Sequence, residues 1–152
     1  MESGMRPAGI LFDKDGTLVD FRATWVPAYL GVADELATLA RRPDIAHELL
    51  SRMGFEVHQD RFAEDSPLVW ATNAMIAERW GLEPELADID VLEVVERHFQ
   101  DLVRYPPVPV GDVAALMRRL RGRGLRLGMA TMDGIGPARS TAELLGIQGE
   151  LE

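Results

Sequence analysis

Residues 8–20 read AGILFDKDGTLVD, and this stretch decides the fold that we expect for the chain. Its first five residues are apolar or small and lead into Asp13, a pattern typical of a strand buried on both faces. Asp13 and Asp15 are two residues apart, so their side chains leave the end of the strand on the same side. Gly16 then allows the backbone to turn sharply. The sequence therefore predicts a buried strand whose carboxyl end carries two carboxylates.

The rest of the chain is expected to be mainly helical until a second strand at residues 125–130. Apolar residues recur at intervals of three and four, which predicts amphipathic helices. These helices are expected at residues 23–42, 43–53, 88–103, 113–120 and 137–145. A further helix is expected to open at Pro67, with Ser66 as its N-cap. Strand, helix and strand in this order predict an α/β core interrupted by a helical insertion.

Composition narrows the class of protein and its partners. With 152 residues, 47% of them hydrophobic, the chain can form one domain or a small core with an inserted lobe. It has no cysteine, which makes a reducing cytoplasm the expected location. The net charge of -9 would repel a phosphate backbone, so we expect no nucleic-acid partner. No apolar run is long enough to cross a bilayer, so we expect no membrane partner.

Other proteins also place acidic residues and glycine close together. In a calcium-binding EF-hand loop aligned on Gly16, Leu11 and Arg22 would occupy positions that need oxygen ligands. A phosphoacceptor signalling domain normally carries its acceptor on a later strand, and a long helical insertion after the acidic cluster would be out of place there. Asp13, Asp15 and Thr17 could also simply cap a turn. The full string after a buried strand favours a catalytic role.

The string DKDGT at residues 13–17 resembles the first motif, DxDGT, of the haloacid dehalogenase superfamily. The layout of the chain is similar to the phosphoglycolate phosphatase-like branch of that superfamily. The apolar strand LGMAT at residues 127–131 resembles the second motif, although Met132 stands where asparagine is usual. The resemblance implies an α/β, Rossmannoid core formed by residues 1–20 and 104–152. It also implies that residues 21–103 form an inserted α-helical cap.

The resemblance assigns roles to individual residues. Asp13 would be the nucleophile that accepts the phosphoryl group, and Asp15 would be the general acid and base. Mg2+ would be bound by the carboxylate of Asp13 and the carbonyl of Asp15. The hydroxyl of Thr131 and the backbone N-H of Met132 would bind phosphoryl oxygens. Arg22 is a candidate for pairing with a carboxylate on the substrate.

Two further motifs of the superfamily, a lysine or arginine and an acidic pair that holds Mg2+, lie tens of residues beyond the second motif. Only 21 residues follow Thr131, and the single lysine, Lys14, lies in the first motif. We therefore expect a truncated core that belongs to a longer parent protein. An incomplete sheet would leave an exposed strand edge, which favours self-association.

For the longer parent protein, the resemblance implies Mg2+-dependent hydrolysis of a small phosphorylated metabolite, with phosphoglycolate as a candidate substrate. A phosphomutase uses the same first motif and remains an alternative. A dehalogenase is disfavoured because that branch lacks the second aspartate, which Asp15 supplies here. From another class, the chain could be a catalytically incomplete remnant that serves as a binding or regulatory module. Turnover of an aryl phosphate with and without Mg2+ distinguishes the enzyme from the remnant.

Overall fold

A computed structural model describes residues 7–152, which form two compact units. The first unit contains the described residues up to Thr24 together with Pro106–Glu152, and the second contains Trp25–Tyr105. The second unit begins and ends a few residues later in the chain than residues 21–103, which the sequence suggested for the helical insertion. The chain therefore leaves the first unit once and returns to it once.

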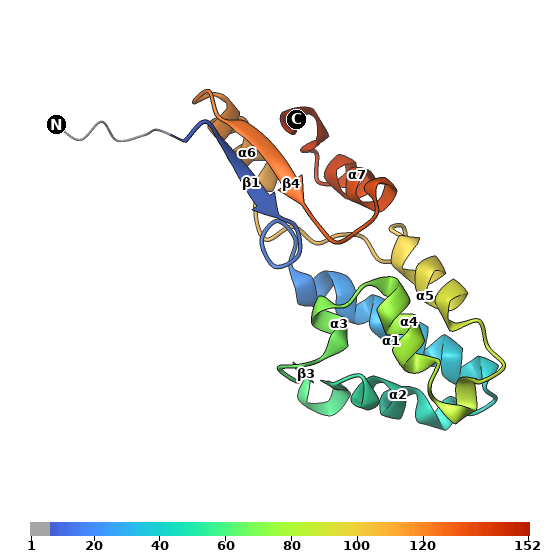
Figure 1. The fold of residues 1–152 in the computed structure, drawn as a ribbon. Coiled ribbons are helices and arrows are strands. Elements are labelled where there is room, and N and C mark those ends of the chain that lie inside the picture. Colours follow the sequence, from blue (N-terminus) through green and yellow to red (C-terminus); the bar gives the residue numbers. More distant parts are fainter. Residues whose placement is uncertain (1–6) are drawn as a thin grey trace. The chain divides into compact units, whose positions relative to one another are not determined.

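The first unit contains a parallel two-stranded sheet (Figure 1). Strand β1 (Gly9–Asp13) pairs with β4 (Arg126–Ala130), and Asp13 lies opposite Ala130 in the register. The helices of this unit are α6 (Val113–Arg121) and α7 (Ile135–Leu144), followed by a short 3-10 helix, η4 (Gln148–Glu150). The sequence thus predicted the order of strand, helix, strand and helix in this unit.

The core of the first unit lies on one face of this sheet. Its buried members come from both helices, from β4, from the loop after β1 and from the residue before η4; they are Leu18, Val113, Met117, Leu127, Ala142 and Ile147. Ile10 and Phe12 of β1 pack against this core. Leu11 points to the other face, where it is 70% exposed and lies over Gly128. The prediction that β1 is buried on both faces is therefore wrong, because the described residues cover only one face of the sheet.

Helix α1 (Phe21–Leu39) begins in the first unit and continues into the second. The other helices of the second unit are η1 (Pro43–Ile45), α2 (Ala46–Arg52), η2 (Val57–Gln59), α3 (Pro67–Trp70), α4 (Asn73–Trp80), η3 (Pro84–Leu86) and α5 (Val91–Gln100). Strands β2 (Phe55–Glu56) and β3 (Arg61–Phe62) form a short antiparallel pair that the sequence analysis did not predict. Among residues 7–152, no helix combines the length and apolar character that crossing a membrane requires.

Ser66 has a different role from the expected one. Its hydroxyl is buried and donates a hydrogen bond to the carbonyl of Met53 at 2.8 Å, and it makes no capping bond to α3. Helix α3 ends at Trp70, and α4 starts separately with Thr72 as its N-cap, which accepts a hydrogen bond from the amide of Met75. The single helix expected from Pro67 is therefore two helices, because the Thr72 cap starts a new one.

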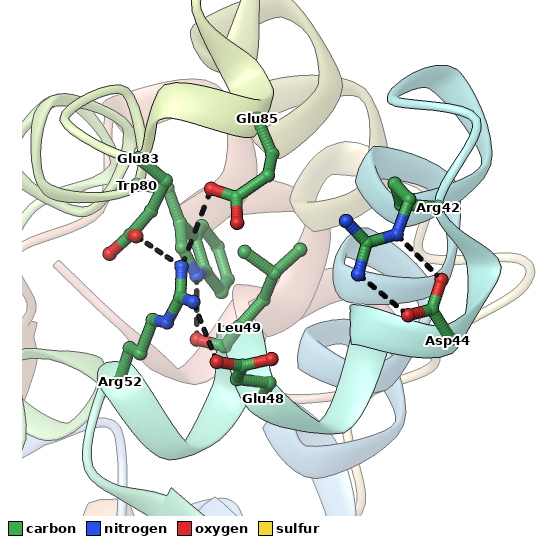
Figure 2. Close-up of polar contacts among 8 residues, drawn as sticks. All are labelled: Arg42, Asp44, Glu48, Leu49, Arg52, Trp80, Glu83 and Glu85. Atoms are coloured by element: carbon green, nitrogen blue, oxygen red, sulfur yellow. Dashed lines mark hydrogen bonds and ion pairs between the residues drawn. The ribbon is translucent and has the colours of Figure 1, made fainter.

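An arginine connects α2 to residues 80–86, the segment that contains η3 (Figure 2). The guanidinium of Arg52 binds the carboxylate of Glu48 at 2.6 Å and also that of Glu83, and it lies 3.5 Å from Glu85. Beside it, the indole N-H of fully buried Trp80 donates to the carbonyl of Leu49 at 3.0 Å. Charged contacts and a buried aromatic side chain thus hold α2 against this segment.

A second polar cluster connects α1 to α5. Glu35 binds the guanidinium of Arg97 through both carboxylate oxygens, at 2.6 and 3.0 Å, and His98 Nε2 at 2.7 Å. The hydrogen bond from Arg97 is the main cause that lowers the pKa of Glu35 from 4.5 to about 2. On its other side, His98 Nδ1 lies 3.0 Å from the hydroxyl of Tyr105. The buried imidazole therefore has a polar partner on each ring nitrogen.

Candidate active site

The two predicted motifs meet at the carboxyl end of the sheet. Asp13 is the last residue of β1 and is exposed, and it lies opposite Ala130, the last residue of β4. Thr131 follows Ala130 directly. Adjacent strands are about 4.8 Å apart. The strand register therefore places Asp13 and Thr131 at the same edge.

The backbone of the loop after β1 is held by its own hydrogen bonds. The carbonyl of Lys14 accepts from three amides, those of Thr17, Leu18 and Val19, at 3.3, 2.9 and 3.1 Å. Gly16 has a left-handed φ of 81°, which glycine adopts at little cost, and its amide donates to the carbonyl of Val19. Leu18 and Val19 are buried and anchor the loop. The loop therefore holds the backbone of Asp15 in a defined position.

The side chain of Lys14 is buried between two carboxylates. It is 2% exposed, and its Nζ lies 2.8 Å from Oδ1 of Asp15 and 3.1 Å from Oδ2 of Asp133. Asp133 was not among the residues predicted for the site. One signal could have identified it: Asp133 closely follows the second strand, and parallel strands end at a common edge. Asp133 thus joins the site residues that the sequence predicted.

Thr131 and Met132 differ in how they are held. The Oγ1 of Thr131 accepts a hydrogen bond from the amide of Asp133 at 3.1 Å. A hydroxyl that accepts one hydrogen bond can still donate its own hydrogen. The side chain of Met132 is 76% exposed. A methionine side chain has no hydrogen-bond donor, so the expected contact with phosphate must come from the backbone N-H of Met132.

Arg22 is the predicted site residue that the strand register does not bring to Asp13. It lies exposed in the first turn of α1, whose start is fixed by Asp20, because the carboxylate of Asp20 accepts from the amide of Ala23 at 2.9 Å. The amide of Asp20 also donates to the carbonyl of Val108 at 2.7 Å, which ties this turn to the returning chain. The expected contact of Arg22 with a substrate stays a prediction.

The oxygen atoms at this edge suit a magnesium ion that is shared with a substrate. Within residues 7–152, no group of three or more histidine, aspartate or glutamate side chains is placed to hold a metal. Mg2+ is usually bound by one or two carboxylates together with waters and phosphate oxygens, so a complete protein cage is not required. The carboxylate of Asp13 and the backbone carbonyl of Asp15 fit this pattern. The Asp15 carboxylate binds Lys14 instead.

Comparison with known proteins identifies the family. A family model described as haloacid dehalogenase-like hydrolase matches residues 7–152. No curated protein matches the chain. The matched range covers β1, the whole second unit and β4. It therefore contains both strand ends at which the candidate site residues lie.

Proposed function

The chain belongs to the haloacid dehalogenase-like hydrolases, and on this premise we propose that it provides the nucleophile for Mg2+-dependent hydrolysis of a small phosphate monoester. The observation that carries the proposal is the shared edge of β1 and β4. There Asp13 and Thr131 end adjacent parallel strands, and Asp15 follows in a loop with a fixed backbone.

In the first step, a carboxylate oxygen of Asp13 attacks the phosphorus atom. The bond from phosphorus to the alcohol oxygen breaks as the bond to Asp13 forms, which gives an aspartyl-phosphate. The departing oxygen takes a proton from the carboxyl group of Asp15 and leaves as a neutral alcohol. A hydrolysis that is difficult in one step is thereby divided into two easier displacements.

In the second step, a water molecule attacks the phosphorus atom of the aspartyl-phosphate. The carboxylate of Asp15 takes a proton from this water, and the bond between phosphorus and Asp13 breaks. Asp13 returns to a carboxylate, Asp15 returns to a carboxylic acid, and inorganic phosphate is released. The side chains of the protein are therefore unchanged after one turnover.

Phosphate carries negative charge into a site that is itself acidic. The hydroxyl of Thr131 and the backbone N-H of Met132 would donate hydrogen bonds to phosphoryl oxygens. The carboxylate of Asp13 and the carbonyl of Asp15 would hold Mg2+, whose chemical contribution is to neutralise charge between carboxylate and phosphate. Local donors and the metal would together offset the repulsion between phosphate and the carboxylates of the site.

We further propose that the second unit acts as the cap that selects the substrate. It is inserted between the two motifs in the sequence, after Thr24 and before Pro106. Arg22 is positively charged and precedes this insertion, so a short phosphorylated acid such as phosphoglycolate is the favoured substrate class. The phosphoglycolate phosphatase-like branch is the part of the family that suits such a substrate.

The experiment is an assay of phosphate release from phosphoglycolate and from p-nitrophenyl phosphate, with Mg2+ and with excess chelator. We expect turnover that needs Mg2+ and that falls at least about 1000-fold in Asp13→Asn, because the nucleophile is lost. Glu143→Gln is the matched control, since it removes an exposed carboxylate from α7 of the same unit. This variant should keep full activity.

The same assay separates the proposal from its alternatives. Release of phosphate that is unaffected by Asp13→Asn would overturn the assignment of the nucleophile. Conversion of a sugar phosphate to its isomer without release of phosphate would identify a phosphomutase. Absence of any turnover, together with absence of Mg2+-dependent binding of beryllium fluoride, would favour a binding or regulatory module.

A further inference from the structure

The first unit contains a buried cation that the proposed mechanism does not use. Lys14 is the only lysine of the chain, and its side chain is 2% exposed. Lysine side chains are almost never buried to this degree unless they are paired, because removing an ammonium group from water is unfavourable. Lys14 has carboxylate partners on two separate segments, Asp15 and Asp133. Its burial therefore requires both segments to be in place.

The two partners come from the two motifs. Asp15 lies in the loop after β1, two residues beyond the proposed nucleophile, and Asp133 lies just after β4. Asp133 is held by its own amide, which donates to Oγ1 of Thr131 at 3.1 Å. The backbone carbonyl of Lys14 is fixed by three amides of the following turn. Both ends of the contact are therefore anchored in ordered backbone.

We propose that Lys14, held by Asp133, is a positioning residue that orients the carboxyl group of Asp15 for proton transfer. The contact distinguishes the two oxygens of Asp15, because Nζ of Lys14 binds Oδ1. This inference rests on the proposed function. It adds Lys14 and Asp133 to that function, as residues that fix the orientation of the Asp15 carboxyl group.

The test compares two substrates whose leaving groups depend to different degrees on receiving a proton from an acid. A nitrophenolate leaves readily without a proton, whereas the alkoxide of phosphoglycolate does not. The parameter to measure is kcat/KM, which contains only the steps up to the first irreversible one. Lys14→Met should lower kcat/KM for phosphoglycolate about 10- to 100-fold more than for p-nitrophenyl phosphate, since a positioned acid contributes about 100-fold or more. Loss of fold alone would lower both values equally.

Asp133→Asn provides a second variant in case Lys14→Met does not fold. It keeps Lys14 but removes one carboxylate from it, so the same selective loss should appear, in the range of about 3- to 10-fold. Arg121→Met is the matched control, because it removes an ion pair with Glu152 at 2.8 Å from the same unit. The control should leave the ratio of the two kcat/KM values unchanged. Equal losses on both substrates in Lys14→Met and Asp133→Asn would overturn the inference.

A chemical measurement tests the contact independently of activity. Because the chain has one lysine, reductive methylation with formaldehyde followed by peptide mapping reports on Lys14 alone. We expect Lys14 to react at least about 10-fold more slowly in the unaltered protein than in Asp133→Asn, because the ion pairs keep it buried. Equal rates would overturn the inference even in an active enzyme. Slow modification combined with no turnover of either phosphate would instead overturn the proposed function, and the positioning role with it.

Discussion

Gly31 is a residue that weakens its own helix and is required by the packing around it. It lies in α1, where glycine costs about 1 kcal/mol relative to alanine. A Cβ atom at this position would lie 2.0 Å from the hydroxyl oxygen of Tyr105 and 2.9 Å from Nδ1 of His98. These two groups are hydrogen-bonded to each other. The missing side chain thus makes room for the bond between Tyr105 and His98.

We expect Gly31→Ala to lower the free energy of unfolding by about 1–3 kcal/mol, because an overpacked contact outweighs the gain in helix propensity. Urea denaturation followed by circular dichroism measures this change. Gly136→Ala in α7 is the control: apart from its chain neighbours a Cβ there meets nothing within 4 Å, and because Pro137 follows it, the substitution should cost less than Gly31→Ala but bring no full gain in helix propensity. The loss in Gly31→Ala should shrink in a Tyr105→Phe background. Stabilisation by both alanines would contradict the packing argument.

Single residues also show what could be predicted about the site. Asp13 and Asp15 could be assigned to a strand end because alternation and glycine are local signals. The ion pair of Lys14 with Asp133 depends on the register of β4 against β1, and one sequence does not fix that register. The cost of Gly31 was predictable, but its cause was not, because Tyr105 is distant in the sequence. Contacts between distant residues are therefore the part that sequence patterns missed.

At the level of elements, Glu35 joins α1 to α5 through an acid-sensitive contact. Its pKa is lowered from 4.5 to about 2, mainly by the hydrogen bond from Arg97. A lowered pKa means that folding stabilises the charged form. The stabilisation is therefore fully present above pH 4.5 and is lost as the pH falls from there through about 2.

We expect Glu35→Gln to lower the free energy of unfolding at neutral pH by about 1 kcal/mol, a value reduced for partial exposure to solvent. The difference from the unaltered protein should shrink as the pH falls from 4.5 to about 2, where Glu35 itself becomes neutral. Denaturation curves at a series of pH values measure this convergence. Glu96→Gln, an exposed change on α5, is the control. A difference that is independent of pH would contradict the assigned role of the carboxylate.

Arg52 makes a different connection, between α2 and the segment containing η3 (Figure 2). Arg52→Met should destabilise the protein, because Glu48, Glu83 and Glu85 would then repel one another without a cation among them. The loss should become smaller with added salt, which screens this repulsion. Thermal unfolding at low and high ionic strength measures both effects. Arg42→Met is the control, since the ion pair of Arg42 within residues 7–152 is with exposed Asp44, two residues away, and should matter less.

The elements were predicted with uneven success. The long helix α1 was predictable because its apolar residues are regularly spaced. The same holds for helix α6 and for strand β4, which follows it. The short strands β2 and β3 have two residues each, too few for alternation to be recognised. The pattern of β1 suggested burial on both faces, yet Leu11 is exposed, because local hydrophobicity does not show how many neighbours a strand will have. Periodicity therefore identified elements better than their surroundings.

On the scale of the whole molecule, the site should couple metal and phosphate binding to stability. Mg2+ with beryllium fluoride, a mimic of the phosphoryl group on Asp13, should raise the free energy of unfolding by about 2.7 kcal/mol when present at 100 times its dissociation constant. Thermal unfolding with and without the two components measures this gain. Asp13→Asn should lose it, while Mg2+ alone should act mainly by screening a net charge of -9. Equal stabilisation of Asp13→Asn would place the binding elsewhere.

The division into two units determines which spectroscopic signal reports on each unit. All three tryptophans and both tyrosines of the chain lie between Trp25 and Tyr105, within the second unit. The first unit contains the proposed nucleophile, Asp13, but no tryptophan or tyrosine, so tryptophan emission reports the unfolding of the helical unit. Far-ultraviolet dichroism detects the backbone of both. If the two signals change at different denaturant concentrations, the part that holds Asp13 and the part inserted after it melt separately.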